Sequence, residues 1–137
     1  MSIQRVALLF GVVFIALAVL GFMGTGIGMP EMHGNMDNMP LVLGLFPVNV
    51  AHNGVHALFG VWALVASRSA KASMLFAMVS GAVYLVLAGL GIYAPNGFGL
   101  VPLGGYDILL HVGIAVVLVG FALVEALRPT PVGANAR

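Results

Sequence analysis

The sequence predicts an all-α fold, an integral membrane bundle of four antiparallel transmembrane helices with both termini on the cytoplasmic side. Of the 137 residues, 61% are hydrophobic and only 7% are charged, whereas a soluble domain carries about 25% charged residues. The chain contains four apolar segments close to the roughly 20 residues that a helix needs to cross the hydrocarbon core. Its few basic residues lie outside these segments. These three observations indicate a membrane protein.

The four expected spans follow one another with short connections. We expect them at residues 6–23, 47–66, 74–93 and 106–127, with apolar residues from Leu41 leading into the second span. Short loops make consecutive helices antiparallel neighbours in a bundle. Residues 1–127 are therefore expected to form a single four-helix transmembrane domain, and residues 128–137 a polar C-terminal tail.

The basic residues predict the orientation of the bundle. The five are Arg5, Arg68, Lys71, Arg128 and Arg137. They lie at the N-terminus, in the second loop and at the C-terminal end, whereas the first loop (24–40) and the third (94–105) contain none. Because cytoplasmic loops carry the excess of Lys and Arg, we expect both termini in the cytoplasm and the first and third loops outside.

Composition excludes several classes of function. The net charge of +1, without a basic cluster, lacks the electrostatic footprint of a nucleic-acid-binding protein. The absence of cysteine excludes disulfides, thiolate metal sites and thiol redox chemistry.

A polar stripe marks the second span, in the segment "FPVNVAHNGVHALFG". Asn49, His52, Asn53, His56 and Gly60 follow the spacing i, i+3, i+4, i+7 and i+11, which places them on one side of a helix that turns about 100° per residue. Polar side chains are costly in hydrocarbon and normally face the bundle interior or a water-filled cavity. We therefore expect this stripe to face the neighbouring helices.

The fourth span carries a matching pair in "YDILLHVG". Asp107 and His111 are four residues apart and share a helix face. His52 lies 16 residues before Arg68 and His111 lies 17 before Arg128, so both are expected at one depth in the outer half of the membrane. This predicts an outer-leaflet site at which His52, His56 and His111 bind a metal ion (copper or zinc) or haem.

In this interpretation Asp107 is a metal ligand or orients an imidazole, and Asn49 and Asn53 are supporting polar residues. The alternative is that these side chains only form hydrogen bonds between helices. Asp107, two residues after Gly105, could then be a cap of the fourth helix.

The first outer loop is rich in methionine, in the segment "GMPEMHGNMDNMP". Met29, Met32, Met36 and Met39 recur every three or four residues, with His33 among them. Thioether and imidazole ligands suit Cu(I), so these five residues are candidate metal ligands. The alternative is an outer loop whose methionines lie against the membrane interface.

Two motifs resemble those of a known family. The segment "LGLFPVNVAHNGVHALFGVWALVASRS", with "YLVLAGLGI" and "GLVPLGGYDILLHVGIAVVLVGFAL" after it, is similar to the DUF4383 family of small four-span bacterial membrane proteins. The shared patterns are His-Asn-x-x-His-x-x-x-Gly, at His52 to Gly60, and Asp-x-x-x-His, at Asp107 and His111. Tyr106 and the methionine-rich loop depart from the family pattern. The resemblance implies four spans and the bacterial inner membrane, but no activity.

Three classes of function remain open at this point. The first is a metal- or haem-binding membrane protein. The second is an accessory or structural subunit that packs against a larger membrane complex or forms a homo-oligomer within the lipid bilayer. The third is an enzyme that uses His and Asp for proton transfer, for which the sequence shows no substrate-binding signature.

Overall fold

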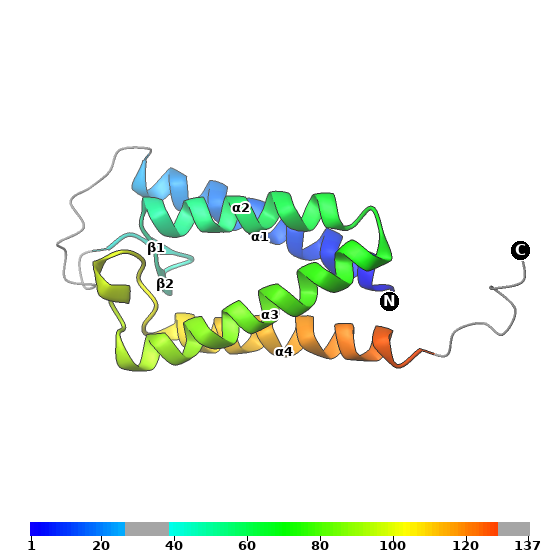
Figure 1. Cartoon of the computed structure of the whole chain (residues 1–137). Coiled ribbons are helices and arrows are strands. Elements are labelled where there is room, and N and C mark those ends of the chain that lie inside the picture. Colours follow the sequence, from blue (N-terminus) through cyan, green and yellow to red (C-terminus); the bar gives the residue numbers. More distant parts are fainter. Residues whose placement is uncertain (27–38, 129–137) are drawn as a thin grey trace, which may run out of the picture.

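The computed structural model describes residues 1–26 and 39–128. Within these ranges it contains four α-helices, which confirms the predicted all-α bundle (Figure 1). They are α1 (Ile3–Thr25), α2 (Val50–Ala66), α3 (Ala70–Tyr93) and α4 (Tyr106–Ala126). Two short strands, β1 (Leu41–Val42) and β2 (Phe46–Pro47), pair antiparallel before α2, and a 3₁₀ turn, η2 (Gly97–Gly99), lies between α3 and α4.

Side-chain caps explain where three of the helices begin. Ser2 accepts a hydrogen bond from Arg5 N, Asn49 from His52 N and Ser69 from Ala72 N, at 3.4, 2.8 and 3.1 Å. Each satisfies a backbone N–H that has no partner inside its helix. α4 begins differently, after Gly105 with φ 68°, and without a side-chain cap. Asp107 is in its first turn but is not the capping residue.

The helices form two close pairs, α1 with α2 and α3 with α4. In Figure 1 the pairs approach each other near the N-terminus and separate toward the other end, where β1 and β2 lie between them. We call these the termini end and the hairpin end. Glycines allow the close pairing, since a Cβ on Gly60 would lie 2.8 Å from the Ile15 side chain and one on Gly81 would lie 2.5 Å from Val119.

A tight apolar core fills the bundle between the helices. Its fully buried members include Phe14, Phe76 and Leu118. The Trp62 ring packs edge-on against Phe76, with 5.1 Å between ring centroids. Ser73, also buried, donates a hydrogen bond to the Ala66 carbonyl at 2.9 Å. The buried hydroxyl of Ser73 is therefore paired, as buried polar groups usually are.

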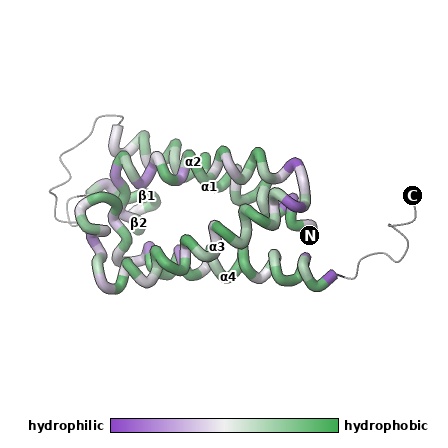
Figure 2. Tube along the Cα trace, in the orientation of Figure 1, coloured by the Kyte–Doolittle hydropathy of each residue, from purple (hydrophilic) through white to green (hydrophobic). Residues whose placement is uncertain are grey.

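The outer faces of the helices suit contact with lipid. α1, α3 and α4 are long and apolar enough to cross a membrane, whereas α2 is shorter, with 17 residues. α2 begins at Val50, three residues after the expected start of the second span. Large apolar side chains such as Leu58, Val86 and Val116 point outward, and Figure 2 shows hydrophobic residues along most of each helix. The chain is a membrane protein of helical-bundle type.

Candidate metal centre

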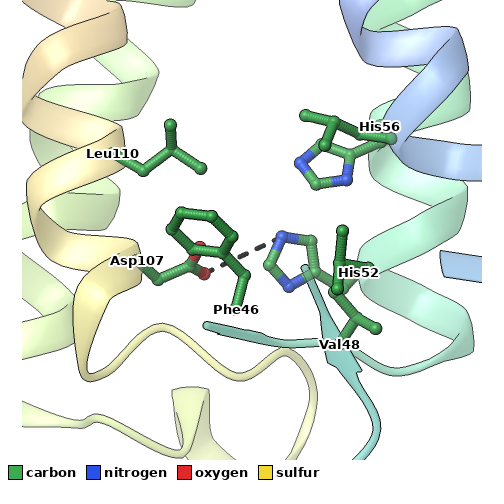
Figure 3. Close-up of a pocket in the computed structure, with 8 residues that line it drawn as sticks. Phe46, Val48, His52, His56, Asp107 and Leu110 are labelled. Atoms are coloured by element: carbon green, nitrogen blue, oxygen red, sulfur yellow. Dashed lines mark ion pairs between the residues drawn. The ribbon is translucent and has the colours of Figure 1, made fainter. Parts of the chain in front are cut away.

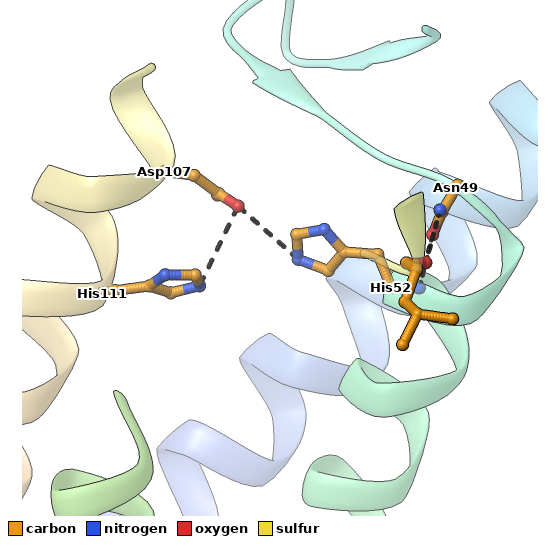
Figure 4. Close-up of polar contacts among 5 residues, drawn as sticks. Asn49, His52, Asp107 and His111 are labelled. Atoms are coloured by element: carbon orange, nitrogen blue, oxygen red, sulfur yellow. Dashed lines mark hydrogen bonds and ion pairs between the residues drawn. The ribbon is translucent and has the colours of Figure 1, made fainter. Parts of the chain in front are cut away.

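The site lies at the hairpin end, where polar side chains of the two helix pairs lie close together. α2 supplies His52, and α4 supplies Asp107 and His111. All three side chains are buried, with exposed fractions of 4%, 1% and 2%. The i, i+4 spacing on α4 places Asp107 and His111 on one face, and that face is turned toward His52 (Figure 4).

Asp107 lies between the two imidazoles. Its Oδ2 atom is 3.8 Å from His52 Nε2 and 3.9 Å from His111 Nε2. The three residues can offer one ligand atom each, all within 4.8 Å of one another. These separations exceed the 2.7–3.2 Å of an N–H···O hydrogen bond. The groups are thus close enough to share one small ion but too far apart to bond directly.

His56 lies one turn along α2, next to this group but outside it. Its ring centroid is 4.6 Å from that of His52. On its other side it stacks on Phe14, with 5.9 Å between centroids and an interplanar angle of 13°. The structure therefore brings two of the three expected histidines onto Asp107 and leaves the third as their immediate neighbour.

Several buried polar atoms at this end have no hydrogen-bond partner among the described residues. They are the Nδ1 atoms of His52, His56 and His111, Asn53 Oδ1 and Asp107 Oδ2, and Ser80 Oγ and Tyr84 Oη, in the middle of α3, are unpaired as well. An unpaired buried polar atom costs about 1–3 kcal/mol. Such a concentration in one place points to a ligand or to ordered water as the bonding partner.

Asn49 and Asn53 have different positions from those expected of a shared stripe. Asn49 precedes α2 as its N-cap, and its Nδ2 donates to the Leu100 carbonyl at 2.9 Å, so it links α2 to the α3–α4 loop. Asn53 is turned toward α1, where its Nδ2 donates to Thr25 Oγ1 at 3.0 Å. Both residues hold elements together and neither belongs to the three-residue group.

A small pocket opens beside the group (Figure 3). Its lining comes from α1, the hairpin, α2 and α4: Leu17, Val42, Phe46, Val48, His52, His56, Asp107 and Leu110. The interior volume is about 10 Å³, close to the minimum for one water molecule. Organic cofactor sites commonly measure about 300–1,000 Å³. The pocket thus fits an ion or a water molecule.

The methionine-rich loop lies mostly outside the described residues. Met29, Met32, His33 and Met36 fall in the range 27–38, so their role as copper ligands stays a prediction. Met39 is described and partly buried, just before the hairpin.

Tyr84 of α3 is a component of the site that the sequence reasoning missed. Its ring centroid is 5.2 Å from that of His111, and its other face stacks on Phe14 at 5.7 Å. The side chain is 2% exposed. A phenol in the middle of an otherwise apolar span was the available signal, because Tyr in membrane helices is enriched at the interfaces.

Comparison with known proteins identifies the family. The family model described as "Domain of unknown function (DUF4383)" matches residues 4–124, and the chain belongs to this family. No curated protein and no solved structure matches the chain. A function for the site has to be inferred from its own chemistry.

Proposed function

We propose that this member of the DUF4383 family binds one transition-metal ion between α2 and α4, with His52, Asp107 and His111 as ligands. The observation that carries the proposal is the spacing of the three donor atoms around Asp107. In a tetrahedral zinc site the donors lie about 2.0–2.2 Å from the ion, hence roughly 3.3 Å from one another. Movements of about half an ångström per side chain would bring these atoms to that distance.

The charge balance of the site supports the same proposal. Asp107 is 1% exposed, and a buried carboxylate is costly without a positive partner. The Lys and Arg side chains in the described residues are those of Arg5, Arg68, Lys71 and Arg128. All four lie near helix ends at the termini end of the bundle. A divalent cation would provide the missing countercharge at the hairpin end.

The donor types narrow the identity of the ion. Two imidazole nitrogens and one carboxylate oxygen suit Zn²⁺ or Cu²⁺, whereas Cu(I) prefers thioether and thiolate ligands. Three protein ligands leave a fourth position open, as in zinc sites that bind water. His56, which faces the same pocket, is available to hold that water or to serve as the fourth ligand. The small pocket favours an ion over haem.

The binding experiment needs protein without a polyhistidine tag. The chain is purified in detergent through a peptide tag that lacks histidine, stripped with a chelator and titrated calorimetrically with Zn²⁺ and Cu²⁺. We expect one ion per chain. Replacing Asp107 with Asn keeps the shape but removes the charge, so affinity should fall by at least about 100-fold, since even changes around the ligands cost 10- to 100-fold.

Glu125→Gln is the matched control, because it makes the same carboxylate-to-amide change at a residue that is paired with Arg128 at the termini end, and it should leave Zn²⁺ affinity unchanged. Equal affinity in the Asp107→Asn variant and the parent would contradict the proposal. If the folded parent bound no ion at all, the alternative of an accessory subunit in a larger complex would take its place. The outer-leaflet position of the site and the bacterial inner membrane remain part of this proposal.

A further inference from the structure

α2 is at the lower limit of length for a helix that crosses the membrane alone. Its 17 residues extend about 26 Å at 1.5 Å per residue, whereas the hydrocarbon core is about 30 Å thick. α1, α3 and α4, with 23, 24 and 21 residues, extend at least about 31 Å on the same basis. At the termini end α2 is followed directly by the turn that contains Arg68, and Lys71 lies in the first turn of α3. The length by which α2 is shorter than the other helices is therefore missing at the hairpin end.

The β1–β2 hairpin occupies that missing length. β1 packs against α1 and β2 against α4, and Val42 and Phe46 line one pocket with Leu17 and Leu110. Leu17 is eight residues before Thr25, the last residue of α1, which corresponds to about 12 Å along the helix. The hairpin thus lies beside the helices, at a depth where α1 is still within the membrane.

The hairpin sequence contains no polar side chain. Residues 40–47 read "PLVLGLFP". Leu41, Leu43 and Leu45 point away from the protein, with 52%, 71% and 47% exposure, while Val42 is 6% exposed. Three neighbouring leucines on one outward face would be unfavourable in water.

The turn residue Leu43 gives the clearest indication that the hairpin is not surrounded by water. Leu43 and Gly44 both have positive φ, 54° and 70°, and Leu45 N donates to Val42 O at 3.1 Å, so they are the central residues of a tight turn within the three-residue loop that joins Val42 to its partner Phe46. Such turns in water strongly favour Asn, Asp or Gly at these positions. A leucine there bears backbone strain. Transfer of its outward side chain from water into lipid would offset that strain.

From these observations we infer that the β1–β2 hairpin is embedded in the bilayer, completing the span of α2, with Leu41, Leu43 and Leu45 against lipid acyl chains. Non-helical backbone is tolerated at membrane depth where protein covers it and its polar groups are bonded. Strand pairing, the bond from Leu45 N to Val42 O and a 3.0 Å bond from Val48 N to Pro40 O satisfy part of this backbone. The two prolines have no N–H to satisfy. The inference does not depend on whether the pocket binds a metal.

Spin labelling can test the inference because the chain has no cysteine. A nitroxide is attached to Leu43→Cys, and separately to Leu45→Cys, in protein reconstituted into phosphatidylcholine vesicles. Its accessibility to oxygen and to a water-soluble nickel chelate is then measured by power saturation. Leu58→Cys, at a site 67% exposed in the middle of α2, is the lipid control, and Lys71→Cys is the water control.

We expect both hairpin labels to resemble the Leu58 label, accessible to oxygen and protected from nickel. Nickel accessibility equal to that at Lys71 would place the hairpin in water and overturn the inference. Protection from both reagents would also overturn it, because a protein partner or a second copy would then cover the leucines. Using two label positions keeps the test valid if one variant fails to fold.

Discussion

The two ends of the bundle solve the problem of burying polar groups in opposite ways. Toward the termini end the polar atoms are few and bonded, as in the Ser73–Ala66 hydrogen bond, and the rings of Phe76 and Trp62 fill the space between helices. At the hairpin end, His52, Asp107 and His111 are buried at distances that do not allow direct hydrogen bonds. Only the first arrangement maximises stability.

This difference separates the residues that hold the fold from those that give it a function. Polar groups in a membrane interior are costly and are characteristic of functional sites. The packing near the termini end can hold the two helix pairs together, while at the hairpin end His52, Asp107 and His111 lie between them (Figure 4). Substitutions at the first end should therefore act on stability, and those at the second on ligand binding.

The largest expected loss of stability follows from Phe76→Ala. The side chain is fully buried, and buried Phe→Ala substitutions cost about 3–5 kcal/mol. We expect about 3 kcal/mol, since helix association in membranes depends on packing rather than on transfer from water. Equilibrium unfolding in mixed micelles would measure it.

Leu75→Ala is the control for this prediction. Leu75 is the preceding residue but is 59% exposed, so its loss should cost less than about 1 kcal/mol. Equal losses for the two variants would mean that the core near Phe76 does not dominate stability, and the comparison between the two ends would fail.

A smaller loss is expected from Gly91→Ala, at the hairpin end. A Cβ on Gly91 would collide with the Leu103 carbonyl and lie 2.8 Å from Ile108 Cγ1. Overpacking costs about 1–3 kcal/mol, and the shift should also displace the start of α4. We therefore expect lower thermal stability in detergent together with weaker Zn²⁺ binding at Asp107.

Gly89→Ala provides the matched control on the same helix. Nothing lies within 4 Å of a Cβ at Gly89, so this variant should be as stable as the parent or gain up to about 1 kcal/mol from helix propensity. A Gly91→Ala variant with unchanged stability and metal affinity would show that the loop before α4 is not rigidly held against α3.

The sequence was sufficient to predict the fold class and the proximity of the two histidine-bearing helices. Long apolar segments indicate membrane helices because the bilayer fixes both their length and their composition. The nearly equal numbers of residues to Arg68 and Arg128, 16 and 17, predicted one level for His52 and His111, since helix rise is constant, and their ring centroids lie 6.5 Å apart. Their function as ligands was not settled by this reasoning and is proposed above.

The sequence could not assign each polar residue to a particular neighbour. His52 and Asn53 differ by about 100° around the helix, so one broad stripe can face two neighbours, and Asn53 faces α1 while His52 faces α4. Asn49 fits the same periodicity but belongs to the cap, because α2 begins one residue later. The hairpin was missed because its unbroken apolar run is typical of the start of a helix.

The smallest expected change in stability concerns Tyr84, at the boundary between the two ends. Its hydroxyl is buried and has no hydrogen-bond partner within the described part of the chain, so Tyr84→Phe removes a polar atom while keeping the ring contacts with Phe14 and His111. Because burying an unbonded hydroxyl costs free energy, the variant should match the parent or gain about 1 kcal/mol. Tyr93→Phe, at a position 87% exposed, is the control and should change stability less.

Zn²⁺ affinity measured on the same samples sharpens the test. A loss of stability only in the metal-loaded form would show that the hydroxyl bonds to the ligand shell and assign Tyr84 to the site. If stability fell equally with and without metal, the hydroxyl would have a structural hydrogen-bond partner. The contrast between bonded polar atoms at the termini end and unbonded ones at the hairpin end would then be weaker.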